Sequence, residues 1–143
     1  MLGEYIVLSK LLGEKANIEK ILVVDDEQDI VTIIGKVLKK NGYEVITAND
    51  GLECIGKVES ELPDLILLDN VMPNMDGQAV LSRLKASKKT EDIPVIMVTA
   101  LADEEHINGA QKGGAVEYIV KPFGYNVLLE KIKQTLKSKR KKV

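Results

Sequence analysis

Short apolar runs alternate with amphipathic stretches along most of the chain. Each run holds four or five residues with few polar interruptions, which is typical of a strand buried on both faces of a sheet. In the stretches between them, apolar residues recur every three or four positions, which is the period of a helix. The pattern predicts strands over 21–24, 44–48, 65–68, 95–98 and 117–120, and helices over 29–40, 51–61, 78–86, 103–112 and 126–137.

The regular alternation of strands and helices favours one architecture. Strands separated by helices pair in parallel, and right-handed connections place the helices on both faces of the sheet. The sequence therefore predicts an α/β fold, a doubly wound five-stranded parallel sheet in a (βα)5 three-layer sandwich. In such folds a ligand binds at the carboxyl ends of the strands, so the residues that follow each strand are the candidates for chemistry.

Two terminal segments lie outside the predicted domain, which spans 19–137. Residues 1–18 form an N-terminal extension that is expected to be helical, because several apolar residues fall roughly on one helical face: Leu2, Tyr5, Leu8, Leu11 and Leu12. Such a helix suits packing on the domain, oligomerisation or docking to a partner, and the sequence leaves these alternatives open. Residues 138–143 form a basic C-terminal tail.

Charge is distributed unevenly over the 143 residues. The formal net charge is −2, but residues 131–143 hold seven basic residues and no acid, which leaves 13 basic and 22 acidic residues in 1–130. With no Trp, one Phe and four Tyr, the chain also has few aromatic side chains on which bases could stack. Both observations speak against nucleic acid as a partner.

The single cysteine and the single histidine exclude several kinds of site. Cys54 cannot form an intramolecular disulfide, which fits a reducing cytoplasm, and we expect it to be an inert packing residue. His106 cannot build a multi-histidine metal site and is expected on a solvated helix face. No apolar run reaches the roughly 18 residues of a membrane span. We therefore expect a cytoplasmic protein without membrane insertion.

Charged and polar residues follow the predicted strands. Asp25 and Asp26 follow the first strand, Asp69 the third, Thr99 the fourth and Lys121 the fifth. Since the carboxyl ends of parallel strands meet at one edge of the sheet, these side chains should lie together. Two carboxylates ~4 Å apart repel by about 4 kcal/mol at an effective dielectric of about 20, so the cluster calls for a cation. Magnesium prefers such carboxylates together with a phosphate oxygen, and a carboxylate can attack phosphorus. The residues therefore predict phosphoryl transfer to an aspartate.

Four longer segments carry these residues in order: ILVVDDE (21–27), DLILLDNVMPNMDG (64–77), PVIMVTA (94–100) and GAVEYIVKPF (114–123). Together they resemble the response-regulator receiver domain of two-component signalling, in particular a single-domain receiver similar to the chemotaxis regulators. The resemblance covers roughly 18–137. It implies a flavodoxin-like fold with the strand order 2-1-3-4-5.

The resemblance also implies a metal site. Asp69 matches the phosphoacceptor of the family, and Asp25 and Asp26 match the acidic pair that binds Mg²⁺. The backbone carbonyl of Val71 would be a further ligand, so the implied metal ligands are Asp25, Asp26, Asp69 and Val71. Mn²⁺ is an alternative to Mg²⁺.

Three further residues match the family in catalysis and switching. Lys121 matches the lysine that pairs with the phosphoryl group, and the Lys121–Pro122 peptide bond is expected to be cis. Thr99 matches the switch hydroxyl, which acts in catalysis with Asp69 and Lys121. Tyr118 matches the switch aromatic residue.

The implied function is a phosphorylation-activated signalling switch and not an independent enzyme. A sensor histidine kinase would donate the phosphoryl group, and a downstream protein would bind the face made by the fourth helix, fifth strand and fifth helix of the receiver (103–112, 117–120 and 126–137). A phosphorylation-dependent homodimer is compatible with the same face. The alternatives are a phosphorylation-independent docking module and a receiver fragment of a larger response regulator.

Two other classes of similar chemistry or fold fit poorly. A phosphatase of the haloacid dehalogenase type needs a second Asp two residues after the nucleophile, where this chain has Val71. A flavin carrier needs a phosphate-binding loop rich in Ser, Thr and Gly after the first strand, where this chain has the acidic sequence DDEQD.

Overall fold

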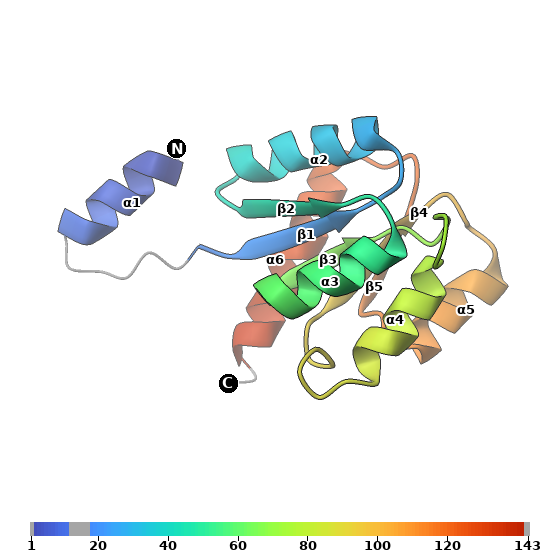
Figure 1. Ribbon diagram of the computed structural model, residues 1–143. Coiled ribbons are helices and arrows are strands. Elements are labelled where there is room, and N and C mark those ends of the chain that lie inside the picture. The colour runs from blue at the N-terminus through green and yellow to red at the C-terminus, as the bar shows by residue number, and fades with distance from the viewer. Residues whose placement is uncertain (1, 12–17, 142–143) are drawn as a thin grey trace.

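A parallel sheet forms the centre of the computed structural model, which describes residues 2–11 and 18–141 (Figure 1). The described residues contain one five-stranded sheet with the order β2-β1-β3-β4-β5. Its strands are β1 (Lys20–Val24), β2 (Glu44–Ala48), β3 (Leu65–Leu68), β4 (Val95–Thr99) and β5 (Glu117–Val120). The predicted doubly wound sheet and its strand order are confirmed.

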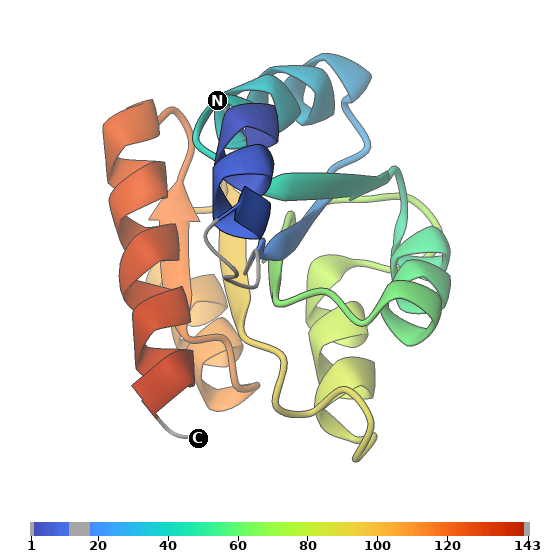
Figure 2. The same cartoon turned by 90° about the vertical axis from the view of Figure 1, so that its left-hand side faces the viewer.

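Helices cover both faces of this sheet, as the two views in Figures 1 and 2 show. One face packs on α2 and α6, and the opposite face packs on α3, α4 and α5. The helices are α1 (Leu2–Leu11), α2 (Gln28–Lys40), α3 (Gly51–Glu61), α4 (Gly77–Lys85), α5 (Glu104–Lys112) and α6 (Tyr125–Lys141). The three-layer arrangement is confirmed.

The central strands send side chains alternately into two cores. In β1, Ile21 and Val23 join the core beneath α2 and α6, whereas Leu22 and Val24 join the core beneath α3, α4 and α5. All four side chains are at most 2% exposed. Burying a side chain of this size contributes about 1.5–3 kcal/mol, and both faces need such side chains. This two-sided burial explains why the strands are continuous apolar runs.

Both terminal segments are partly helical. The N-terminal extension contains α1, in which Val7, Leu8 and Leu11 are exposed, and Leu12 of the predicted helical face lies outside the described residues. At the other end, α6 continues to Lys141, four residues beyond the predicted helix end at Lys137. The sequence after Lys137 has no Gly or Pro to end the helix, so 138–141 belong to α6 rather than to a separate tail. None of the described helices combines the length and hydrophobicity needed to cross a bilayer.

Cys54 in α3 should resist thiol reagents in the native protein. Its side chain is 0% exposed, and burial, together with the charges of Asp50 and Glu53, raises the pKa of the thiol to about 12. The reactive thiolate is therefore scarce at neutral pH. Iodoacetamide should modify Cys54 only as fast as the protein opens. Ser60→Cys in a Cys54→Ala background, exposed on the same helix, should react at the rate of a free thiol. Equal rates at both positions would contradict the burial of Cys54.

Candidate functional site

The backbone of the sheet brings the strand-end residues together. Val24 pairs in register with Leu68, so Asp25 and Asp69 follow neighbouring positions on β1 and β3. The Asp69 N–H donates to the Val24 carbonyl at 3.0 Å. Further along the sheet, at the ends of β5 and β4, the Lys121 N–H donates to the Thr99 carbonyl at 2.9 Å. These ladder bonds fix the direction in which each side chain leaves the sheet.

Three carboxylates form a tight acidic cluster at this edge. Asp25, Asp26 and Asp69 each place one carboxylate oxygen within 4.8 Å of the others. Asp25 is 3% exposed and Asp69 is 5% exposed, whereas Asp26 is exposed to solvent. Burial strengthens the repulsion between the carboxylates of Asp25 and Asp69, because less water screens them. The exposed Asp26 leaves the cluster open on one side.

A single ammonium group partly compensates this charge. Lys121 Nζ lies 2.5 Å from Asp25 Oδ2 and 3.2 Å from Asp69 Oδ2. Burial alone would lower the pKa of Lys121, but the hydrogen bond to Asp25 and the charge of Asp69 outweigh it and raise the pKa. Lys121 therefore stays charged, and the cluster keeps an excess of negative charge. The Lys121–Pro122 peptide bond is cis.

The loop after β3 is anchored by residues that the sequence analysis did not single out. Asn70 Oδ1 accepts the Gln78 N–H at 2.9 Å, and the Asn70 carbonyl accepts the Gly77 N–H at 2.9 Å. A Cβ atom on Gly77 would clash with the Asp69 carbonyl oxygen and lie 2.7 Å from Asn70 Cα. The start of α4 therefore packs directly against the backbone of Asp69. In the sequence, the signal for this close approach was a Gly directly after Asp76, which is the N-cap residue of α4.

Val71 lies at the rim of the acidic cluster. Its N–H donates to Asp69 Oδ1 at 3.3 Å, and its side chain is 57% exposed. The same loop thus orients one oxygen of the Asp69 carboxylate, while Lys121 contacts the other.

Thr99 and Tyr118 are joined through Leu101. Thr99 is 0% exposed, and its Oγ1 accepts the Leu101 N–H at 3.4 Å. The Tyr118 hydroxyl donates to the Leu101 carbonyl at 2.7 Å. Burial, followed by the charges of Asp103 and Asp69, raises the pKa of Tyr118, which keeps the hydroxyl protonated as a donor. The backbone of Leu101, in the β4–α5 loop, thus contacts both side chains.

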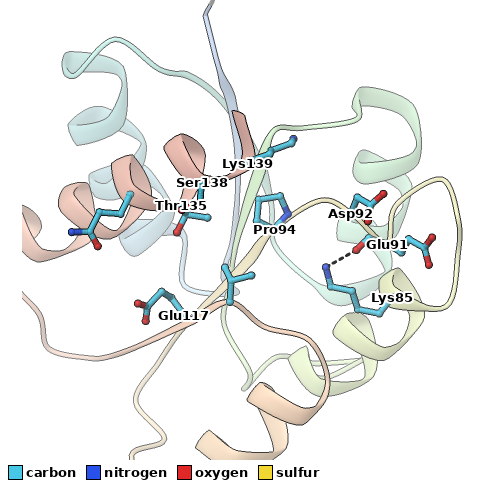
Figure 3. Close-up of a pocket in the computed structure, with 10 residues that line it drawn as sticks. Lys85, Glu91, Asp92, Pro94, Glu117, Thr135, Ser138 and Lys139 are labelled. Atoms are coloured by element: carbon cyan, nitrogen blue, oxygen red, sulfur yellow. Dashed lines mark hydrogen bonds between the residues drawn. The ribbon is translucent and has the colours of Figure 1, made fainter. Parts of the chain in front are cut away.

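A cavity of about 410 Å³ lies at the opposite end of the strands (Figure 3). Pro94 precedes β4, Glu117 opens β5 and Lys139 comes from the end of α6, so the cavity is remote from the acidic cluster. Lys85 Nζ donates to the carbonyls of Glu91 and Ile93 at 2.8 and 2.9 Å. Burial lowers the pKa of Lys85 despite the nearby Asp92 and Glu91. Lys85 thus ties down the loop before β4, which is a structural role.

The comparison with known families identifies the family to which this fold belongs. A model of the response regulator receiver domain matches residues 21–133. The chain belongs to this family. The receiver domain is the signalling switch of two-component response regulators, and phosphorylation of an aspartate and Mg²⁺ binding at an acidic pocket are properties of the family.

Known receivers are similar to this one over most of its length. The alkaline phosphatase synthesis transcriptional regulatory protein PhoP of Bacillus subtilis is 42% identical over 120 residues, which are 83% of this chain and 49% of PhoP. Sporulation initiation phosphotransferase F of the same organism is 37% identical over 118 residues, 82% of this chain and 94% of that protein. The chain thus spans about half the length of PhoP and nearly all of phosphotransferase F.

A solved structure supports the same assignment. The CheY-like receiver domain protein of Methanospirillum hungatei superposes with a TM-score of 0.84 at 34% identity, covering 89% of this chain and 100% of that one. The fold and the family are therefore shown by both sequence and structure.

Substitution of Gly77 by Ala should destabilise this receiver. The added methyl group meets backbone atoms of Asp69 and Asn70 that cannot move aside, and such overpacking costs about 1–3 kcal/mol. Gly56→Ala is the matched control, because Gly56 is exposed in the middle of α3 with no atom within 4 Å of an added Cβ. This control should gain about 0.5–1 kcal/mol. Urea unfolding measures the free energy of unfolding of both variants. Equal stability of the two variants would contradict the close packing at Asp69.

Proposed function

We propose that Asp69 accepts a phosphoryl group from a phosphohistidine of a sensor histidine kinase, and that this modification switches the binding of a downstream protein. The observation that carries the proposal is the position of the Asp69 carboxylate, which lies beside the acidic pair and 3.2 Å from the ammonium of Lys121. A carboxylate at the carboxyl edge of a parallel sheet, with a fixed cation on one side, is suited to attack an incoming phosphorus atom.

The transfer is a substitution at phosphorus. An oxygen of Asp69 forms a bond to phosphorus, and the bond from phosphorus to the donor nitrogen breaks. The electron pair of that bond stays on the imidazole nitrogen, which takes up a proton as required. Lys121, already 3.2 Å from Asp69, pairs with the negative charge that the phosphoryl group brings.

The acidic cluster fits a hard divalent cation. Its donors are all oxygen atoms, and the one ammonium of Lys121 does not balance three carboxylates. Asp25, Asp26, Asp69 and the carbonyl of Val71 would hold Mg²⁺, and the same oxygen donors suit Mn²⁺. A bound cation would neutralise the cluster and polarise the phosphoryl oxygens. Because Asp26 is exposed, it is the ligand through which the cation would enter.

Thr99, Leu101 and Tyr118 carry the signal in this proposal. Before phosphorylation, the Thr99 hydroxyl oxygen accepts the Leu101 N–H. After phosphorylation, the hydroxyl turns to donate to a phosphoryl oxygen, and its hydrogen bond with Leu101 breaks. Leu101 then shifts, and its carbonyl, which accepts the hydrogen bond from the Tyr118 hydroxyl, moves with it. The phosphoryl group thereby changes the relative populations of two arrangements of this loop.

The target surface is the face made by α5, β5 and α6. A hollow of about 230 Å³ between α5 and β5 is lined by apolar side chains that include Ile107, Val116 and Tyr118. Val116 is 52% exposed, so the surface offers apolar area to a partner. A downstream protein is the proposed occupant, and a second copy of this receiver is the alternative that would give a phosphorylation-dependent homodimer.

Two alternatives make different demands on the chain. A docking module without phosphorylation does not need an intact site, yet Asp25, Asp26, Asp69, Thr99 and Lys121 are all present here. A receiver that forms part of a larger response regulator needs the same site and differs only in its output. PhoP, about twice as long as its matched part, is named as a transcriptional regulatory protein, and phosphotransferase F is named for phosphoryl transfer.

The first test concerns the acceptor. Incubation with acetyl phosphate and Mg²⁺ should add the mass of one phosphoryl group to the parent protein and none to Asp69→Asn, because the amide is a poor nucleophile. Asp92→Asn removes an exposed carboxylate outside the cluster and should still be modified. Intact mass spectrometry gives the result. A phosphoryl adduct on Asp69→Asn at the level of the parent would exclude Asp69 as the acceptor.

The second test concerns the cation. Mg²⁺ at about 100 times its dissociation constant should stabilise the native protein by about 2.7 kcal/mol. Asp26→Asn should lose most of this gain, and without Mg²⁺ it should be more stable than the parent because one repulsive charge is gone. Asp29→Asn, an exposed acid of α2 outside the cluster, should keep the gain. Thermal unfolding with and without Mg²⁺ compares the three proteins, and a melting temperature indifferent to Mg²⁺ in all of them would argue against the site.

A further inference from the structure

Strand β2 presents an open edge of the sheet. It is the terminal strand beside β1, on the side of the sheet opposite β5. The Glu44 N–H donates to the Glu19 carbonyl, and the Ala48 carbonyl accepts the Asp25 N–H, so these two residues bond toward β1. In a parallel ladder, alternate residues bond to the same neighbour. Val45 and Thr47 therefore direct their N–H and carbonyl groups away from the sheet.

A groove of about 440 Å³ follows this edge. Its floor is β2, and its walls are α2 on one side and α3 on the other, which lie on opposite faces of the sheet (Figure 1). The lining residues include Lys36 and Lys39 from α2, Lys57 from α3, and no acidic residue. The groove is therefore a basic channel along backbone groups that have no hydrogen-bond partner among the described residues.

The three lysines of this groove are available to a ligand. Each is exposed, and within the described part of the chain none has a carboxylate at ion-pair distance. By contrast, Lys121 contacts Asp25 and Asp69, and Lys131 contacts Glu117. These three lysines form a group of positive charges beside β2 in a protein whose net charge is negative.

A glycine of α2 lines the groove beside β2. Gly35 is buried in the middle of α2, where Gly costs roughly 1 kcal/mol relative to Ala. A Cβ atom there would meet only Val45 Cγ1, at an ordinary 3.6 Å. Packing within the receiver therefore does not require Gly at this position, but its small size leaves room along the strand.

We propose that β2 binds an acidic, extended segment of a partner protein, which adds to the sheet as a further strand. The backbone groups of Val45 and Thr47 would pair with the added strand, as in other cases of strand addition. Side chains of a strand point alternately to its two faces. Consecutive acidic residues would thus reach Lys36 and Lys39 on one wall and Lys57 on the other.

Charge argues against two other occupants. A second copy of this chain joined through β2 would bring two sets of the same lysines together, which is unfavourable. Lysines do protect sheet edges from unwanted pairing, but they usually do so from the edge strand itself. Here β2 has the sequence EVITA without any lysine, and the lysines stand on both flanking helices. These lysines repel a basic strand or the β2 edge of a second copy, and they attract an acidic strand.

A labelled peptide tests this proposal. The probe is fluorescein-labelled TVEEEVT with blocked ends, and the control is the neutral peptide TVQQQVT. Fluorescence anisotropy should show binding of the acidic peptide and at least about tenfold weaker binding of the control. Hydrogen exchange followed by NMR should show the amides of Val45 and Thr47 protected about tenfold on binding. The Ile46 amide, which by alternation already bonds to β1, should change little.

Three variants separate strand addition from a general charge effect. Lys36→Gln with Lys39→Gln should weaken binding about tenfold. Lys133→Gln with Lys137→Gln makes the same charge change on exposed positions of α6 and should leave it unaltered. Thr47→Pro removes an N–H that faces away from β1, so the fold should survive while binding is lost.

Several outcomes would overturn the proposal. Absence of binding would mean that the lysines only protect the edge. Peptide binding without protection of Val45 and Thr47, or equal binding of an oligothymidylate, would indicate non-specific attraction of polyanions. A dimer formed by the receiver alone, lost in Thr47→Pro, would assign the edge to a second copy.

Discussion

The repulsion among Asp25, Asp26 and Asp69 is the constraint around which this receiver is organised. Ladder bonds hold the backbones of the two buried residues, Asp25 and Asp69, on neighbouring strands, which keeps their carboxylates close together. Lys121 offsets part of the repulsion, and its raised pKa reflects the energy that its charge gains beside Asp25 and Asp69. The fold thus stores an unbalanced negative site at the edge of a stable sheet. Such a site favours a divalent cation, and it places the carboxylate of Asp69, the proposed phosphoacceptor, where that cation would bind.

The parts of the fold that the sequence predicted are those set by local pattern. Ile21–Val24 must be apolar throughout because both of its faces are buried, and this is visible as a continuous run. The parallel sheet puts Asp25, Asp69 and Lys121 at the same edge, because each follows a strand, and the strand order then decides which of them are neighbours. The parallel sheet followed from the alternation of strands and helices, whereas the strand order that places β1 beside β3 was implied by the resemblance to receiver domains and is seen in the structure.

What the sequence could not reveal depends on distances between residues far apart in the chain. The bond from Tyr118 to Leu101 joins positions 17 residues apart, and it rests on a rotamer that no local pattern encodes. The close approach of Gly77 to Asp69 is set by how α4 lies on the loop after β3. The end of α6 at Lys141 was missed for a different reason. Residues 138–141 have no helix-breaking residue, and their high charge suggested a solvated tail.

The acidic site and the basic groove are neighbours that a few hydrogen bonds join. The Asp25 N–H donates to the carbonyl of Ala48 in β2 at 3.2 Å. Asn49 adds two side-chain bonds, because its Nδ2 group donates to the Asp25 carbonyl at 3.5 Å and to Gln28 Oε1, on the wall of the groove, at 3.0 Å. Each such bond contributes about 0.5–1.5 kcal/mol at best, and the longer of the two contributes less. Coupling of two sites cannot exceed the energy of the contacts that differ between their states. The proposed switch acts instead through Thr99 and Leu101 toward β5, at the other edge of the sheet. A partner held at β2 would therefore stay bound while the opposite face changes, so that attachment and signalling would be separate properties of one domain.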